Sequence, residues 1–234
     1  MRAILLSAGL GTRLLPITEK TPKCLVKING VSMLEFWLRK LDKKAISTIV
    51  VNTHHFAENV NNEINRIDLT RRVQIFHEKK LLGTAGTLLS VANQITDPEV
   101  LVIHCDNYSE IDLEDFLRAH SSRNKKCLIS MAIFETNNVQ MSGMVEVDKD
   151  NIIREFIEKP AHSDLTYANA AIYAFDHLAI KEISKRFPNA EDISKDILPH
   201  FVGRIQAYKF EGFHMDMGTL ENLEVIQSSF RKLN

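Results

Sequence analysis

The chain has 234 residues, 44% of them hydrophobic and 25% charged, with a formal net charge of −1 at pH 7. This composition is typical of a globular protein, and the length suits one large α/β domain or two small ones. The near-neutral charge offers no global basic field for nucleic acid, and the apolar run near the N-terminus is too short for a signal peptide or a membrane span. We therefore expect a cytoplasmic protein with neither a nucleic-acid nor a membrane partner.

The first half of the chain alternates strand-like and helix-like patterns. Continuous apolar runs predict buried strands at residues 3–8, 46–52, 73–76, 100–104 and 128–134. Apolar residues at helical spacing predict helices over residues 32–44, 57–66, 85–92 and 112–120. This order predicts an α/β fold of Rossmann type, in which helices cover both faces of a doubly wound, mainly parallel sheet in three layers.

The second half of the chain has a different pattern. Two short apolar runs flank the turn-like VDKDN and predict a hairpin, and two further strands and three helices follow. The predicted strands are 144–147, 152–157, 170–175 and 205–210, and the predicted helices are 178–186, 193–201 and 220–233. With no repeat or linker-like tract, we expect a single domain over residues 1–234, with a small β decoration in its second half.

A long loop follows the first predicted strand, at the end of the sheet where open α/β folds bind ligands. Gly9 and Gly11 allow a close approach of the backbone, whose N–H groups could hold a phosphate chain. Arg13 and Lys23 add cationic donors for phosphate oxygens. The Walker pattern is absent, and Leu14 stands where the dinucleotide fingerprint needs glycine, which disfavours a nicotinamide-dependent oxidoreductase.

Two aspartates are candidate metal ligands. Asp106 directly follows the buried run 100–104, and Asp216 precedes the last predicted helix. Each also has an ordinary interpretation, Asp106 as a turn residue and Asp216 as a favourable charge at a helix N-terminus. Carboxylates that face phosphate oxygens are suitable ligands for Mg²⁺, so a shared magnesium site requires the fold to bring the two together.

The whole opening loop carries a resemblance that its single residues do not. SAGLGTRL at residues 7–14, followed by Pro16 and the pair Pro22-Lys23, closely resembles the signature of the sugar-1-phosphate nucleotidylyltransferases. Those enzymes join a nucleoside triphosphate to a sugar 1-phosphate and release pyrophosphate. The resemblance implies that Arg13 and Lys23 are catalytic and neutralise the phosphates. It also implies nucleotide-binding roles for Ala8, Gly9, Gly11 and Thr12.

The resemblance extends to the metal site and the base. It implies that Asp106 and Asp216 hold the Mg²⁺ cofactor, although the family often has glycine where Cys105 stands. The stretch GTAG at residues 83–86 resembles the family loop that lies over the base, and this implies nucleotide contacts from Gly83, Thr84 and Gly86. The nucleotide-binding half would then be residues 1–134, and the sugar-phosphate-binding half residues 135–234.

The second half carries the motifs that imply sugar-phosphate binding. Glu158-Lys159-Pro160 matches a family motif whose glutamate holds sugar hydroxyls and whose lysine meets the sugar phosphate. Asn169 matches an asparagine that helps to bind sugar, although Ala171 replaces the usual glycine two positions later. Gly143 matches a glycine whose backbone touches the sugar.

The function implied is transfer of a nucleotidyl group to a sugar 1-phosphate, by a monomer or homodimer that supplies polysaccharide synthesis. The GTAG stretch looks most like the mannose- and heptose-1-phosphate guanylyltransferases, which favours GTP. A uridylyl- or thymidylyltransferase that acts on glucose-type or N-acetyl amino-sugar 1-phosphates is an alternative. A catalytically inactive nucleotide-sensing subunit is an alternative of another class.

Overall fold

The computed structural model describes residues 1–69, 71–92, 94, 97 and 99–229. The chain divides by its internal contacts into two compact units, each built from separate segments. Unit 1 comprises Met1–Leu81, Ile103–Glu110 and Gly212–Asn234, and unit 2 comprises Leu82–Val102 and Ile111–Glu211. The predicted single domain, with halves that meet after residue 134, stays a prediction.

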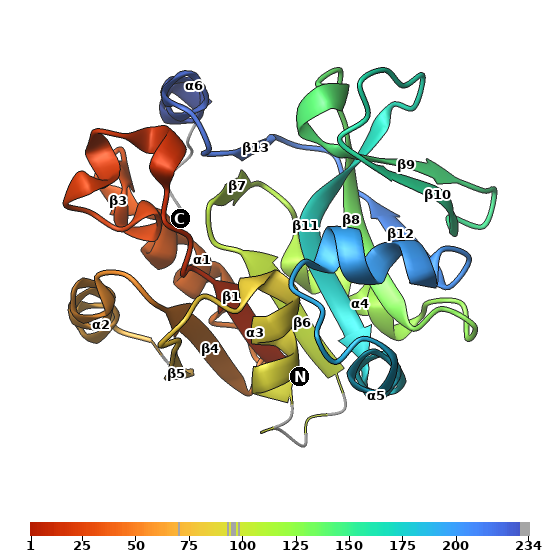
Figure 1. Cartoon of the computed structure of the whole chain (residues 1–234), viewed down its shortest axis with the longest axis horizontal. Coiled ribbons are helices and arrows are strands. Elements are labelled where there is room, and N and C mark those ends of the chain that lie inside the picture. The colour runs from red at the N-terminus through yellow and green to blue at the C-terminus, as the bar shows by residue number, and fades with distance from the viewer. Residues whose placement is uncertain (70, 93, 95–96, 98, 230–234) are drawn as a thin grey trace. The chain divides into compact units, whose positions relative to one another are not determined.

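Unit 1 is built on a parallel sheet, labelled in Figure 1. Strand β4 (Thr48–Thr53) pairs in parallel with β1 (Arg2–Leu6) on one side and with β5 (Arg72–His77) on the other. The core residues of β1 and all of β4 are buried, as expected for strands covered on both faces. Strand β6 (Glu99–His104) begins in unit 2 and ends in unit 1, where the Cys105 amide donates to the Leu6 carbonyl.

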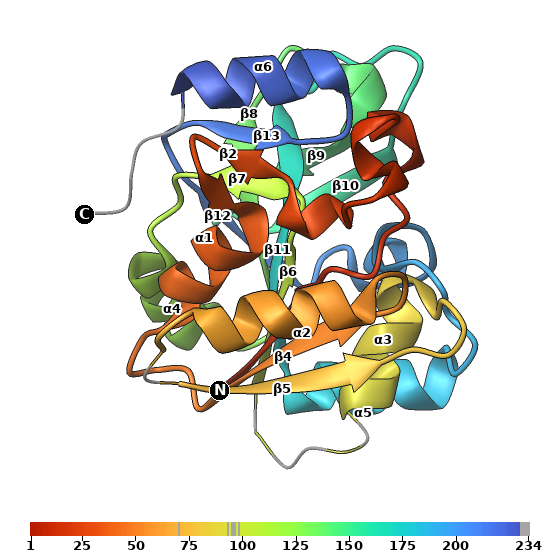
Figure 2. The same cartoon turned by 90° about the vertical axis from the view of Figure 1, so that its left-hand side faces the viewer.

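Two helices connect the strands of unit 1. The hydroxyl of Ser32 accepts a hydrogen bond from the Glu35 amide at 3.1 Å and so caps α1 (Met33–Leu41) in the way typical of serine at a helix N-terminus. Helix α2 (Ala57–Arg66) buries Val60 and Ile64. Figure 2 shows α2 lying over β4 and β5, so the apolar stripe of this helix covers the sheet.

The loop after β1 and the C-terminal part of unit 1 contain short elements that the sequence pattern does not predict. The loop forms three 3-10 turns and a hairpin, at Thr12–Leu14, Ile17–Glu19 and Lys23–Leu25, then β2 (Lys27–Ile28) and β3 (Val31–Ser32). Strands β7 (Asn107–Ser109) and β13 (His214–Asp216) pair in a second, two-stranded antiparallel sheet. Helix α6 runs over Leu220–Ser229, and the rest of the predicted helix 220–233 lies outside the described residues.

Unit 2 contains the mixed part of the sheet, in which four strands are antiparallel in the order β10-β9-β11-β8 and β12 lies parallel to β8. These strands are β8 (Ile129–Glu135), β9 (Gly143–Val147), β10 (Ile153–Glu158), β11 (Tyr167–Asp176) and β12 (Ile205–Lys209). The helices of this unit are α3 (Gly83–Ala92), α4 (Leu113–Ser121) and α5 (His177–Arg186). The pair β9–β10 is the predicted hairpin.

The predicted fold class is confirmed: the protein has an α/β fold with a mostly parallel central sheet and helices on both sides. The helix predicted over 193–201 is wrong as one α-helix, because the structure has a π-helical turn (Ile193–Ile197) and then a 3-10 turn (Leu198–Phe201). Pro199 lies in the second turn and has no N–H to donate, which prevents a regular α-helical ladder there.

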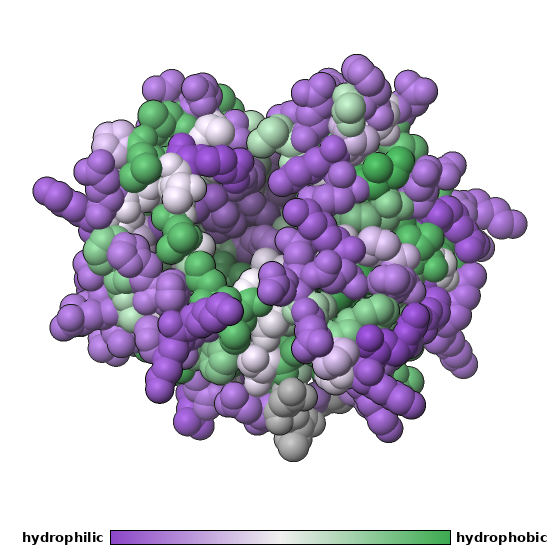
Figure 3. All heavy atoms as spheres, in the orientation of Figure 1, coloured by the Kyte–Doolittle hydropathy of each residue, from purple (hydrophilic) through white to green (hydrophobic). Residues whose placement is uncertain are grey.

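On the face of the molecule drawn in Figure 3, hydrophilic residues predominate and hydrophobic ones occur in small groups between them. Such scattered apolar exposure is ordinary for folded proteins. Among the described residues, no helix combines the length and the apolar character that crossing a bilayer requires.

Candidate active site

A lysine bridges two carboxylates in unit 1. Lys23 Nζ lies 2.5 Å from Asp106 Oδ2 and 3.2 Å from Asp216 Oδ1, although 83 and 193 positions separate the residues of these pairs. The Lys23 side chain is only 9% exposed, whereas the two aspartates keep 33% and 40% of their side-chain surface in contact with solvent. The predicted catalytic lysine and the two predicted metal ligands therefore lie together, with the carboxylates on the open side.

The short β7–β13 ladder brings the two aspartates together. Asp216 on β13 lies opposite Asn107 on β7, and Asp106 immediately precedes β7. The Met217 amide donates to the Asp106 carbonyl at 2.9 Å, and the Asn222 side chain donates to the Asp216 carbonyl at 2.8 Å. Backbone pairing thus holds both aspartates.

The charges of the cluster support one another. Burial by itself would lower the pKa of Lys23, but the negative charges of Asp106 and Asp216 outweigh that effect and raise the pKa above the ordinary lysine value. Burial would likewise raise the pKa of Asp106, yet the charge of Lys23 lowers it. Lys23 and Asp106 are therefore both charged at neutral pH.

Arg13 lies beside the same cluster. Its Nη2 atom is 3.4 Å from Asp216 Oδ2, and 54% of its side chain is exposed. Gly218 makes this contact possible, because a Cβ placed there would lie 2.9 Å from Arg13 Nη2 and even closer to Asp216 Oδ2. The exposed guanidinium is available to an anion that enters from solvent.

The two glycines of the opening loop have different surroundings. Gly11 has φ +66°, and a Cβ there would lie 2.9 Å from Thr18 Cγ2 and 3.1 Å from Lys23 Cβ. The chain itself therefore requires glycine at position 11. A Cβ at Gly9 would meet no atom within 4 Å, so protein packing does not explain that glycine. The neighbouring predicted residues differ in exposure, Ala8 being buried and Thr12 exposed.

The donor set of the cluster fits a magnesium ion. Two carboxylates already converge on one cation, the Lys23 ammonium, and both have exposed surface. Mg²⁺ in nucleotide sites takes one or two carboxylates together with phosphate oxygens and water. Among the described residues no group of three or more His, Cys, Asp or Glu side chains is placed to hold a metal, so the predicted Mg²⁺ site would have to be completed by its substrate.

In unit 2, the predicted base loop forms the first turn of α3, so the helix begins at Gly83 rather than at residue 85. Gly83 has φ +73°, and a Cβ there would collide with the Glu191 carbonyl oxygen. The Thr84 hydroxyl accepts from the Ile193 amide at 2.9 Å, and a Cβ at Gly86 would lie 3.0 Å from Leu82 Cβ. The segment around residue 191 therefore holds this turn in place.

The predicted sugar-phosphate residues lie on neighbouring strands of unit 2. Gly143 and Glu158 are cross-strand partners on β9 and β10, and a Cβ at Gly143 would lie 2.8 Å from Glu158 Oε2. Lys159 follows β10 with φ +47° and a half-exposed side chain, 4.0 Å from Glu158 Oε1. Burial raises the pKa of Glu158, Lys159 opposes the rise, and the charge of Asp192 adds to it.

Asn169 occupies an irregular part of β11. Its Oδ1 accepts from the Ala171 amide at 2.9 Å, and its Nδ2 donates to the Tyr173 hydroxyl at 2.7 Å and to Ser194 Oγ at 3.5 Å. Ala171 has φ +52°, in the left-handed region that favours glycine. The Asn169 side chain thus stabilises a strained turn in the strand.

Sequence reasoning missed the segment at residues 191–196, which lies against both groups of unit 2 residues. The Glu191 carbonyl accepts from the Ala85 amide at 3.0 Å, while Ser194 contacts Asn169. The Asp196 carboxylate accepts from the amides of Glu191 and Asp192 at 2.9 and 2.8 Å. The one available signal was Asp192, which caps the following turn through the Lys195 amide.

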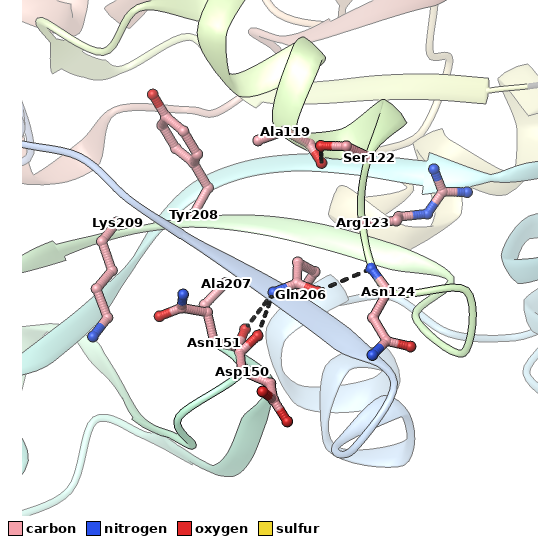
Figure 4. Close-up of a pocket in the computed structure, with 10 residues that line it drawn as sticks. All are labelled: Ala119, Ser122, Arg123, Asn124, Asp150, Asn151, Gln206, Ala207, Tyr208 and Lys209. Carbon is pink, nitrogen blue, oxygen red and sulfur yellow. Dashed lines mark hydrogen bonds between the residues drawn. The ribbon is translucent and has the colours of Figure 1, made fainter.

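A groove of about 650 Å³ on unit 2 is lined by other residues (Figure 4). Its central side chain, Gln206, donates to the carbonyls of Asp150 and Asn151 and accepts from the Asn124 amide. Tyr208 in its wall donates to Asp115 Oδ2 at 2.6 Å. These polar groups brace the fold, and no predicted site residue lines the groove.

An α/β sheet with a glycine-containing cationic loop and paired carboxylates beyond its strand ends is typical of proteins that bind phosphorylated nucleotides. The chain belongs to the nucleotidyl transferase family, whose family model matches residues 2–232. The match extends over nearly the whole chain.

Named relatives are more specific. A protein of Sulfolobus acidocaldarius, provisionally named a mannose-1-phosphate guanyltransferase, is 27% identical over 239 residues, which cover 98% of this chain and 64% of that protein. The mannose-1-phosphate guanylyltransferase catalytic subunit beta of Danio rerio is 28% identical over 224 residues, which cover 93% and 61%. The chain thus spans less than two thirds of the length of these curated relatives.

A solved structure shares the fold. The Bacillus anthracis protein provisionally named a glucose-1-phosphate thymidylyltransferase, crystallised with a sucrose, has a TM-score of 0.85. It is 22% identical, and the match covers 100% of this chain and 96% of that one. At this identity the likeness concerns the fold alone.

Proposed function

We propose that the protein transfers a guanylyl group from GTP to mannose 1-phosphate or heptose 1-phosphate, releases pyrophosphate and depends on Mg²⁺. The observation that carries the proposal is the bridge of Lys23 between Asp106 and Asp216, with Arg13 on the outer oxygen of Asp216. The names of the curated relatives and the GTAG stretch at residues 83–86 support guanine and mannose.

The chemistry needs little proton transfer, because the attacking group is a phosphate oxygen that is already a competent nucleophile. The main difficulty is that two polyanions must meet. Arg13 and Lys23 lower this repulsion and stabilise the negative charge that develops on the α-phosphate and the leaving pyrophosphate. A bound Mg²⁺, held by Asp106 and Asp216, would supply further charge neutralisation for the phosphate oxygens.

The remaining predicted residues would bind and orient the substrates. Gly9 leaves open space beside the backbone, as expected where a phosphate chain approaches closely. Lys159, with its half-exposed side chain, would bind the phosphate of the sugar, and Glu158 its hydroxyl groups. Holding the reactants in line is a large part of the rate enhancement in such reactions.

The test is a matrix of GTP, ATP, UTP and dTTP against the 1-phosphates of mannose, heptose, glucose and N-acetylglucosamine, with pyrophosphate release as the measurement. The proposal predicts the highest kcat/KM for GTP with mannose or heptose 1-phosphate, and loss of activity when Mg²⁺ is chelated. A maximum with UTP or dTTP and a glucose-type sugar would contradict it in favour of the alternative specificity. Nucleotide binding without turnover on any pair would indicate an inactive nucleotide-sensing subunit.

A further inference from the structure

A buried hydrogen-bond chain joins the carboxyl ends of the three parallel strands of unit 1. Ser7, directly after β1, donates from its amide to Asn52 Oδ1 at 2.6 Å and from its hydroxyl to the Asn52 carbonyl at 2.5 Å. Asn52, in β4, donates from Nδ2 to Glu78 Oε1 at 2.8 Å, and Glu78 directly follows β5. We call these three residues the strand-end clamp.

The clamp is built to hold one arrangement. Ser7 is 9% exposed, and Asn52 and Glu78 are each 3% exposed. Because Glu78 accepts from the amide nitrogen of Asn52, the amide oxygen of Asn52 is turned toward Ser7. The Glu78 backbone is fixed as well, since its amide donates to the Thr53 carbonyl and its carbonyl contacts His54 Nδ1, each at 2.8 Å. Buried polar groups of this kind are costly to leave unpaired, so they specify a single geometry.

The position of the clamp relates it to the candidate site. Ser7 is the last residue before the stretch Ala8–Gly11, where the chain leaves the sheet. The β1–β4 register pairs Leu5 with Val51 as its last partners, so the contacts from Ser7 to Asn52 extend the pairing beyond the ladder. A Cβ at Gly9 would meet no atom within 4 Å, so space beside this part of the loop is open.

We propose that Asn52, oriented by Glu78, is a positioning residue for the phosphate-binding loop. It fixes Ser7 through two hydrogen bonds and thereby sets the direction in which Ala8–Gly11 leaves β1. The inference rests on the proposed function in so far as it takes this loop to bind the triphosphate. The clamp would therefore affect the binding of the nucleotide and not that of the sugar 1-phosphate. Because it positions the loop backbone, which would hold phosphates and not the base, the effect should be the same for every nucleotide.

The test combines a structural measurement with a kinetic one. Asn52→Leu removes the two hydrogen bonds of the Asn52 side chain, to the Ser7 amide and to Glu78, but keeps the Asn52 carbonyl that accepts from the Ser7 hydroxyl. Glu78→Leu removes only the acceptor for Asn52 Nδ2, and Glu78→Gln keeps an acceptor oxygen. Amide hydrogen exchange measured by NMR reports the clamp directly, because the Ser7 amide is bonded to a side chain. We expect exchange of the Ser7 amide to be about tenfold faster in Asn52→Leu, while amides within the β1–β4 ladder keep their rates.

The kinetic measurement distinguishes a specific effect on nucleotide binding from a general loss of activity. We expect KM for the nucleoside triphosphate to rise about tenfold in Asn52→Leu and less in Glu78→Leu, and KM for the sugar 1-phosphate to stay unchanged. Glu78→Gln, unlike Glu78→Leu, should keep both the exchange rate of the Ser7 amide and the nucleotide KM close to the wild-type values. The matched control is Ser130→Ala in unit 2, which removes a buried hydrogen bond to His120 and should change neither measurement.

Several results would overturn the inference. Unchanged exchange of the Ser7 amide in Asn52→Leu, or in Glu78→Leu if the first variant does not fold, would show that no clamp operates. A changed preference among nucleotides in Glu78→Gln would make Glu78 a contact of the base instead. Wild-type protein without transferase activity would defeat the proposed function, whereas the exchange measurement would still test the clamp.

Discussion

Lys23 and Asp106 are 83 positions apart in the chain, and their Nζ and Oδ2 atoms lie 2.5 Å apart. Lys23 also donates to Asp216, and Arg13 contacts the other carboxylate oxygen of Asp216. The charge of the buried lysine lowers the pKa of Asp106, and its two hydrogen bonds hold the carboxylates of Asp106 and Asp216 close together.

Asp106→Asn should abolish turnover without unfolding the protein. The change keeps the size of the side chain but removes its negative charge and one of two candidate magnesium ligands. The measurement is kcat at saturating nucleotide, sugar phosphate and Mg²⁺, with circular dichroism as the check on folding. Asp164→Asn, at an exposed position of unit 2, is the control and should keep full activity. Equal activity of the two variants would refute the metal assignment.

Lys23→Ala should remove about 3 kcal/mol of transition-state stabilisation, the scale expected for a lost electrostatic donor at a developing charge. The kcat/KM of the variant relative to wild type measures this loss. Lys20→Ala removes an exposed lysine of the same loop and should have little effect. A loss of less than tenfold in Lys23→Ala would argue against its role at the phosphates.

Gly9→Ala and Gly11→Ala should have different effects, the first on nucleotide binding and the second on the stability of the fold. Gly11 has φ +66° and close neighbours, so Gly11→Ala should reduce the free energy of unfolding by about 1–2 kcal/mol or more. Gly9 has open space, so Gly9→Ala should leave stability nearly unchanged and raise the nucleotide KM. Denaturant unfolding and steady-state kinetics make the comparison. An unchanged nucleotide KM in Gly9→Ala would mean that the triphosphate does not approach there.

His120 should make the protein less stable at acid pH. Burial lowers the pKa of His120 to about 4, and the charge of Arg123 adds to this. Since the unfolded chain binds the proton at about pH 6.5, stability should fall as the pH drops from about 6.5 toward 4, by up to about 3 kcal/mol. Unfolding free energies of wild type and His120→Gln between pH 7 and pH 4.5 measure the effect. The difference between the two proteins should change with pH, and parallel curves would contradict the prediction.

Ala171→Gly should stabilise the protein. Ala171 has φ +52°, where glycine avoids a cost of about 1–2 kcal/mol but loses part of that gain to the greater entropy of the unfolded chain. We expect the free energy of unfolding to rise by about 0.5–1 kcal/mol. Ala174→Gly is the control, on the same strand without positive φ, and should destabilise. Destabilisation by both variants would show that the Ala171 methyl group contributes packing that outweighs the strain.

Local features of this protein were open to prediction from the sequence. The apolar runs and helical spacings predict the α/β class because they report which faces of an element are buried. The Ser32 cap is a contact with a residue three positions away, so it too can be read from the chain. The resemblance of residues 7–14 indicated the candidate phosphate site. The local pattern was misleading at Ile193–Ile197, where the structure has a π-helical turn in place of the predicted α-helix.

The sequence by itself determined the chemistry available to this protein: the glycine loop, its cations and two candidate carboxylates. Only the tertiary structure decided that Lys23 lies between Asp106 and Asp216. The strands β7 and β13, which bring the aspartates together, have three residues each and are too short to show a period. The strand-end clamp could not be predicted from the sequence either. Its hydrogen bonds join residues far apart in the chain, leave no local pattern and form only when the strands pair.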